Sequence, residues 1–204
     1  VYRPAILDAT AQDELARQIL SQPLTLTLAR GQSDKGPWEI KPDTLAEMLT
    51  FERVEKDGTS AYQVALKKDR LVEYLSKLAP ELLLYPENAR FIFNDDTRQL
   101  DLSQPAVIGR TLDIQASIKS INEKIAAGEH SIPLEFVFTD PPVKDDATAE
   151  QLQIKELVGS HTTYFRGSSA ERLQNIRAAS NRFHGVLVAP GETFSMANQL
   201  GNIS

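Results

Sequence analysis

The stretch DIQASIKSINEKIAAG, residues 113–128, decides the fold of this chain. Its apolar residues recur at the spacing of one helix face: Ile114, Ile118, Ile121 and Ile125. Asp113 or Ser117 can cap the N-terminus, and Gly128 stands where helices commonly end on a left-handed residue. The stretch therefore predicts an amphipathic helix with one apolar face to bury.

A strand follows this helix, and the same order occurs earlier in the chain. Pro133 leads into LEFVF (134–138), and Pro23 leads into LTLTL (24–28), both of which alternate as half-buried strands do. A helix is expected at about 10–21, ahead of the first of these strands. The two copies predict an internal repeat whose units pack on one another, because one unit has too little apolar face to bury alone.

A second echo supports the repeat. Trp38–Ile40 reads as a short strand followed by a helix from Pro42, and Leu100–Leu102 reads as a strand followed by a short helix at 103–109. Between these copies we expect a helix that Asp69 caps and Pro80 stops. Two hairpins complete the pattern, with strands at 51–54 and 62–66 around Asp57-Gly58, and at 89–93 and 98–102 around 94–96.

The last fifty residues have their own signals. SHTTYF (160–165) is rich in β-branched and aromatic residues and predicts a strand. Ser168 and Glu171 have the spacing of a capping box for a helix that Gly185 ends. Residues 186–188 then predict a buried strand, and Pro190-Gly191 has the chemistry of a type II turn.

The fold class predicted from these patterns is α+β, with tandem small antiparallel sheets each packed with a helix and an incomplete third α+β module. We expect a first repeat unit at 1–85, a second at 86–140, a linker at 141–155 and the third module at 156–204. About fifty residues make a marginal core, so we expect this module to lean on the preceding unit or on another chain, which would give a homo-oligomer.

Composition narrows the classes of function. The 204 residues are 41% hydrophobic and 25% charged, which is typical of a globular protein, and they have a net charge of −6. Residues 156–204 carry +1 and the rest −7, so clustered basic residues for nucleic acid are lacking. Cysteine is absent, and the three histidines (130, 161 and 184) lack metal-site spacing. We expect no cofactor and no metal.

Several spaced motifs in the last segment resemble a known family. They are Thr163–Phe165, Arg172-Leu-Gln-Asn-Ile176, Gly185–Val188, Pro190–Ser195 and Gly201. In this order they resemble the start of the VanW-like domain, named from an accessory protein of some vancomycin-resistance clusters. The family's later glycine-rich, cysteine-containing motif would follow Ser204. The activity of that family is not established, so the resemblance assigns no reaction.

Residues of roughly 85–150 resemble the peptidoglycan-binding module that commonly precedes VanW-like domains and some L,D-transpeptidases. The likeness rests on Ala89-Arg-Phe91, Leu100–Leu102, Gly109–Asp113, the isoleucine helix and Pro133–Phe136. It implies a bacterial cell-envelope protein, outside the cytoplasm, tethered by a membrane helix ahead of this chain.

The function expected from this likeness is a non-catalytic module that binds peptidoglycan or positions its parent protein there. Two alternatives stay open: a spacer or protein-interaction module, and the lead-in of a cell-wall enzyme whose active residues lie downstream.

Six residues are candidate ligand contacts. Trp38 could stack on a sugar ring or pack on its own sheet. His161 and Tyr164 lie in the expected strand, and Arg172 and Asn175 in the expected helix. Glu192 adjoins the Pro-Gly turn and could instead orient backbone. No catalytic residue is assigned, because the carboxylates do not pair as an acid and a base and Ser195 lacks a nucleophile motif.

Overall fold

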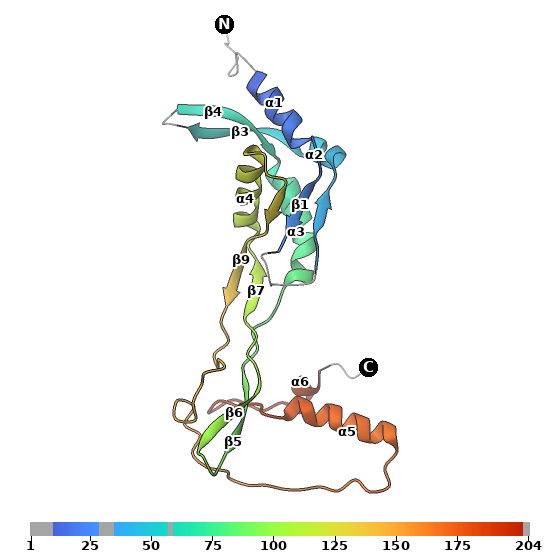
Figure 1. The fold of residues 1–204 in the computed structure, drawn as a ribbon, viewed down its shortest axis with the longest axis vertical. Helices are drawn as coiled ribbons and strands as arrows, with labels where there is room; N and C mark the ends of the chain where they lie inside the picture. The colour runs from blue at the N-terminus through green and yellow to red at the C-terminus, as the bar shows by residue number, and fades with distance from the viewer. Residues whose placement is uncertain (1–9, 29–34, 57–58, 202–204) are drawn as a thin grey trace. The chain divides into compact units, whose positions relative to one another are not determined.

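The computed structural model describes residues 10–28, 35–56 and 59–201. The chain forms two compact units, each built from segments that are not contiguous in sequence: unit 1 comprises 1–83 and 110–138, and unit 2 comprises 84–109 and 139–204. Small antiparallel pairs and several helices make it an α+β protein, which confirms the predicted class (Figure 1). The domain boundaries expected from the sequence, with units at 1–85, 86–140 and 156–204 and a linker at 141–155, remain a prediction.

Unit 1 is centred on a three-stranded sheet in the order β2-β1-β8. These strands span Trp38–Ile40, Leu24–Thr27 and Ser131–Pro133. β1 is antiparallel to β2 and parallel to β8. Helix α1 (Thr10–Ile19) leads into β1 and helix α4 (Ile114–Ala126) leads into β8. The parallel pair is a feature that the strand patterns did not indicate, and the internal repeat itself remains a prediction.

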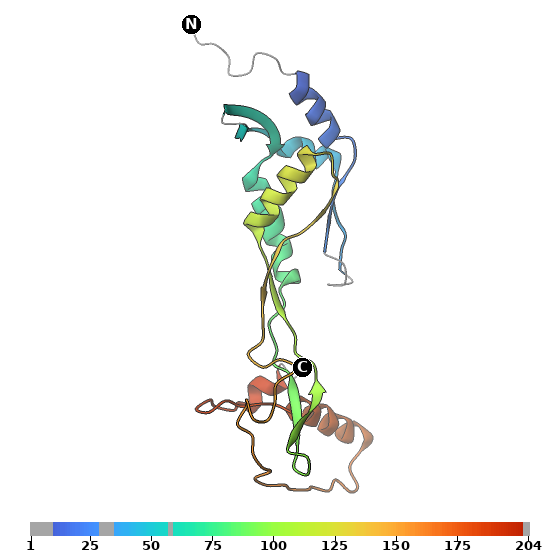
Figure 2. The same cartoon turned by 60° about the vertical axis from the view of Figure 1, so that its left-hand side comes forward.

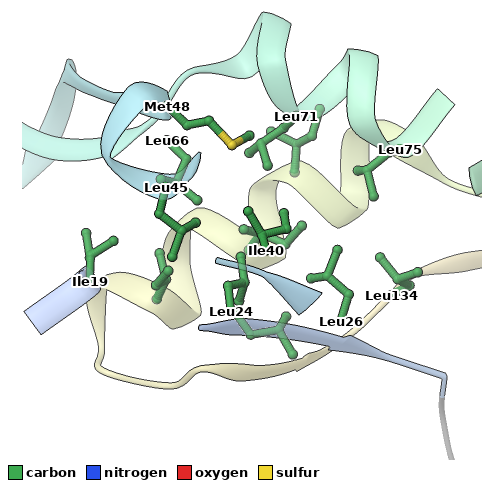
Figure 3. Close-up of a cluster of buried hydrophobic side chains, with 14 of the residues drawn as sticks. Ile19, Leu24, Leu26, Ile40, Leu45, Met48, Leu66, Leu71, Leu75 and Leu134 are labelled. Atoms are coloured by element: carbon green, nitrogen blue, oxygen red, sulfur yellow. The ribbon is translucent and has the colours of Figure 1, made fainter. Parts of the chain in front are cut away.

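The core of unit 1 lies between this sheet and its helices. Leu24 and Leu26 of β1 are fully buried, because alternate side chains of a strand point to one face. Figure 3 shows them in one cluster with side chains from α2 (Pro42–Met48) and α3 (Lys68–Leu82), including Leu45 and Leu71. Ile121 and Ile125 of α4 are also fully buried in this cluster, as the isoleucine spacing predicts.

Both ends of α4 confirm the sequence signals. The Asp113 carboxylate accepts a hydrogen bond from the Ala116 amide at 2.9 Å, so Asp113 is the N-cap. Ser117 is buried inside the helix instead. Gly128 follows the helix with φ of +89°. His130, which comes next, is buried with its ring nitrogens 3.2 Å from the carbonyls of Gly128 and Ile19, so it links α4 to the end of α1.

A long hairpin extends from unit 1. Strands β3 (Leu49–Lys56) and β4 (Thr59–Leu66) pair over their full length, and they run out past α4 (Figure 1). The predicted turn at 57–58 lies outside the described residues. Figure 2 shows α4 in yellow alongside α3 in green, with which it makes contact. A further pair is formed by β7 (Gly109–Leu112) and β9 (Phe136–Thr139), which belong to this unit except for Gly109 and Thr139.

Unit 2 combines a hairpin with one long helix. Strands β5 (Arg90–Asn94) and β6 (Gln99–Gln104) form the predicted hairpin. Helix α5 (Ala170–Phe183) is followed by α6 (Met196–Leu200). The end of α5 docks on β5, since Arg90 donates to the Arg182 carbonyl at 2.9 Å and the Phe91 amide donates to Gly185 at 3.3 Å. Within unit 2, the described part of the last segment, 156–201, thus contacts the hairpin that precedes it.

Two predictions about α3 were wrong. The N-cap is Lys67, and Asp69 lies in the first turn, because the helix starts directly where β4 ends. Pro80 does not stop the helix, which runs on to Leu82. Leu82 is fully buried. Burying such a side chain stabilises by about 1.5–3 kcal/mol, which is comparable to the cost of about 3 kcal/mol for a proline inside a helix.

Unit 2 differs from prediction at four places. Residues 103–109 are extended and bridge Glu87 to Val107 instead of forming a helix. Residues 160–165 and 186–188 are loops, since neither segment has a strand partner among the described residues. The helix cap is Ser169 and not Ser168, and its hydroxyl accepts from the Arg172 amide. The type II turn is confirmed: Gly191 has φ of +84°, and the Glu192 amide donates to Ala189 at 3.0 Å.

Candidate functional site

A groove in unit 1 runs between the β3–β4 hairpin and helix α4, with a volume of about 360 Å³. The register pairs Glu52 with Gln63 across the hairpin, so both side chains lie on one face. The α4 residues on the other side repeat at helical spacing. The lining residues are Glu52, Gln63, Val64, Ala65, Lys68, Gln115, Ile118, Lys119, Asn122 and Glu123.

Asn122 fixes one wall of the groove to the other. Its side-chain oxygen accepts from the Leu66 amide at 2.8 Å, and its amide group donates to the Leu66 carbonyl at 3.2 Å. This pair of bonds continues the sheet pattern from β4 onto the side chain of a helix. Because Asn is not a strong helix former, its place in the middle of α4 is explained by this bridge.

A second side chain occupies the same strand edge. The Val64 amide donates to the side-chain oxygen of Gln12, from α1, at 2.8 Å. The edge of β4 is therefore engaged at Val64 and Leu66, which closes these positions to a further strand. Edge strands in native proteins are commonly covered in such ways.

The charges of the groove are balanced. Two lysines and two glutamates line it, together with three carboxamides. Lys119 and Glu123 are one helical turn apart, with 3.9 Å between ammonium nitrogen and carboxylate oxygen, and their side chains are 77% and 65% exposed. Such a long, exposed ion pair holds its partners weakly. Both groups are therefore accessible to a ligand.

The six residues expected from the sequence do not form one site. Trp38 packs half-buried against the core of unit 1, beside Leu26 in the register. His161 and Tyr164 are exposed in a loop of unit 2, and Arg172 and Asn175 are exposed on α5. In the part of the chain that the structure describes, no hydrogen bond or ion pair joins any two of the six.

Glu192 has a structural contact in its turn. Its carboxylate accepts a hydrogen bond from the Ala189 amide at 3.1 Å. This contact orients the backbone of the turn, which is the alternative to a ligand contact that the sequence left open for Glu192. Sequence reasoning missed the groove residues altogether. The polar residue in the middle of the isoleucine helix, Asn122, was the one local signal that could have pointed to them.

Other hollows lie in unit 2, and in two of them several polar groups are already engaged. One contains Asp140, Lys144 and Asp145. There, the hydrogen bond and charge of Asp140 raise the pKa of Lys144, and Asp145 accepts from the Ala106 amide at 2.6 Å. The other contains Asn88 and Arg90. Asn88 accepts from the Val143 amide and Arg90 binds carbonyls at the end of α5.

Two observations concern the described residues as a whole. None of their helices combines the length and apolarity needed to cross a membrane. Nor do their His, Asp and Glu side chains gather in groups of three or more that could hold a metal ion.

Comparison with solved structures found two chains with weak likeness. One is described as the Ldtfm-avibactam carbamoyl enzyme, with 14% identity, a TM-score of 0.39, and coverage of 68% of this chain and 51% of that one. The other is a cysteine-to-serine mutant of the Enterococcus faecium L,D-transpeptidase, with 14% identity, a TM-score of 0.38, and coverage of 65% and 49%. This chain thus spans about half the length of each.

A likeness at this level assigns neither fold nor activity. No curated protein matches the chain. A family model matches a continuous part of the sequence that contains much of unit 1 and residues 84–109 of unit 2. Residues 40–132, which include all ten lining residues of the groove, match the family model described as "Putative peptidoglycan binding domain".

Proposed function

We propose that this protein binds peptidoglycan and that the groove between the β3–β4 hairpin and α4 is the binding site. The observation that carries the proposal is the position of the groove, which lies wholly within the residues that match the family model. Its volume of about 360 Å³ is in the range of small-ligand sites, and its amides and charges offer directed hydrogen bonds.

The proposal places the protein in the cell envelope as a non-catalytic module. Within it, residues 156–204 are the N-terminal part of a VanW-like domain, on the motifs from Thr163 to Gly201. A membrane helix ahead of this chain anchors the parent protein, and any wall chemistry belongs to its other domains. The net charge of the chain is negative, which does not favour adhesion to the wall by charge alone. We therefore expect binding through the groove and not through net charge.

Sedimentation with purified sacculi tests the proposal. We expect the full chain to pellet with sacculi, and Gln115→Trp, which fills the groove from an exposed position on α4, to remain in the supernatant. Ser76→Trp is the matched control, because Ser76 is exposed on α3 and does not line the groove.

Three outcomes decide between the functions. If the wild-type chain fails to pellet at every salt concentration, peptidoglycan binding is wrong and a spacer or interaction role remains. If both tryptophan variants pellet like the wild type, the protein binds peptidoglycan at another surface. Loss of binding in Gln115→Trp alone supports the groove.

A further inference from the structure

We infer that the groove takes the peptide stems of peptidoglycan and not its glycan strands. This inference rests on the proposed function and adds the part of the polymer that is recognised. Peptidoglycan joins chains of amino sugars, which present hydroxyl and acetamido groups, to short peptides that carry free carboxylates and the amine of a diamino acid. The glycan and the peptides are therefore recognised by different kinds of side chain.

The groove lacks the side chains that suit a sugar ring. Large aromatic rings cover apolar faces best, because they supply much contact area with few rotatable bonds. None of the ten lining residues is aromatic, as far as the described residues show. Trp38, the single tryptophan, packs against the core. The aromatic side chains of the hairpin that are exposed, Phe51 and Tyr62, are not among the lining residues.

The charges of the groove suit a peptide with both signs. Lys68 and Lys119 can donate to carboxylates, and Glu52 and Glu123 can accept from an amine. Hydrogen bonds in which a partner is ionised are about twice as strong as neutral ones. An uncharged glycan strand would offer no ionic partner to Lys68 or Glu52 and would leave Lys119 and Glu123 with only their weak mutual pair, whereas a peptide stem offers charges of both signs.

The length of the groove fits a short peptide. Gln115 and Glu123, at the two ends of the lining stripe on α4, are eight residues apart. At 1.5 Å per helical residue this is about 12 Å, which corresponds to roughly three to four residues of extended peptide at about 3.3 Å each. Stems of this size can therefore lie along α4 with their charged groups over the charged lining.

The engaged edge of β4 determines how such a peptide is held. Because Gln12 and Asn122 take the amides of Val64 and Leu66, a ligand cannot add to β4 as a strand at these positions. Recognition must come from side chains. That mode does not need a regular L-peptide backbone, so it accommodates the D-residues and side-chain linkages of peptidoglycan stems. Asn122 is in this view a positioning residue that sets the width of the groove.

Binding of the full chain to three ligands tests the inference: intact sacculi, glycan strands freed of peptide by an amidase, which keep a lactyl carboxylate on each muramic acid but carry no amine, and a soluble stem tetrapeptide with its amine and carboxylates free. We expect pelleting with sacculi, competition by the tetrapeptide, and no binding to the stripped glycan. Lys119→Glu should lower tetrapeptide affinity by roughly tenfold or more, because one charge-assisted hydrogen bond becomes a repulsion.

Lys77→Glu is the matched control. Lys77 is an exposed helical lysine, 71% exposed, that also pairs with a glutamate one turn away, but it does not line the groove. The affinity of Lys77→Glu for the tetrapeptide should equal that of the wild type. Tryptophan fluorescence like that of the wild type shows that Lys77→Glu and Lys119→Glu are folded. Binding to sacculi and stripped glycan without tetrapeptide competition would overturn the inference and leave the proposed function standing. Failure to bind any of the three ligands would overturn both.

Discussion

Replacing Asn122 by alanine should destabilise unit 1, because one side chain holds the β3–β4 hairpin against α4. The variant loses two hydrogen bonds to Leu66, of 2.8 and 3.2 Å. Each such bond contributes about 1 kcal/mol net. Leu66 is fully buried, so its unpaired amide adds a penalty of about 1 kcal/mol. Alanine returns about 0.5 kcal/mol through its better helix propensity.

The expected net loss is about 2 to 2.5 kcal/mol in the free energy of unfolding. Since 1 kcal/mol shifts the midpoint of a small domain by about 4–8 °C, Tm should fall by roughly 8–20 °C. Urea unfolding followed by tryptophan fluorescence measures the effect. Trp38 is the single tryptophan of the chain and packs against the core of unit 1, so its signal reports this unit.

Two further variants separate the bridge from a general effect on the helix. Gln115→Ala changes an exposed residue of the same helix and should stay within about 0.5 kcal/mol of the wild type. Asn122→Asp keeps the acceptor for the Leu66 amide but turns a second oxygen toward the Leu66 carbonyl. Protonation restores the donor, which raises the pKa of this carboxyl in the folded state above its usual value of about 3.9.

The sign of the pH effect follows from that shift. When the pKa of a carboxyl is higher in the folded than in the unfolded state, its protonated form stabilises the fold. That stabilisation is complete below the unfolded pKa and is lost as pH rises through the folded pKa. Asn122→Asp should therefore approach the wild type in acid and fall away toward neutral pH. If Asn122→Ala unfolds at the same urea concentration as Gln115→Ala, water satisfies the Leu66 amide and the bridge is not what fixes the hairpin.

Three other changes probe the ends of the helices. Asp113→Ala removes the N-cap of α4 and should cost about 1 kcal/mol in the same urea assay, whereas Asp113→Asn should retain most of it. Gly185→Ala meets a φ of +70° and would bring its Cβ within 3.1 Å of the Phe91 backbone, so unit 2 should become more sensitive to proteolysis while the Trp38 transition is unchanged. The hydrogen bond to its own backbone amide and that from Ser169 lower the pKa of Glu171 below 4.5, so its contribution to α5 is present above pH 4.5 and lost as pH falls further. Far-UV circular dichroism should show the wild type losing some helix signal in acid as Glu171 becomes protonated. Glu171→Gln has no carboxylate to protonate at this position and should lose less helix signal over the same pH range.

Local patterns predicted the elements that depend only on neighbouring residues. The helix at 114–126 was foreseen with its terminal glycine and with Asp113 as one of two candidate caps, because periodicity, capping and positive φ are all set within a few positions. The strand at 24–27 was foreseen because strict alternation admits few other structures. The segment 160–165 has the residues of a strand but no partner, and β propensity expresses the fit to a neighbouring strand more than a preference of the backbone.

The candidate site lay beyond such patterns, because nothing local marks its halves as neighbours. Glu52 and Gln63 come together through the hairpin register, and Asn122 meets Leu66 across 56 positions of sequence. In the sequence, Lys119 and Glu123 are two ordinary charged residues on the solvent side of a helix. They become a binding candidate only because the hairpin lies beside them and forms the other wall of a groove, and the hairpin is kept there by Asn122 and Gln12. The residues that are hardest to assign from sequence are thus the ones whose chemistry depends on the longest-range contacts. Asn122→Ala loosens the contact between the hairpin and α4 but leaves the charges of the groove in place. Its ligand affinity can therefore separate the contribution of the hairpin's position from that of the charges.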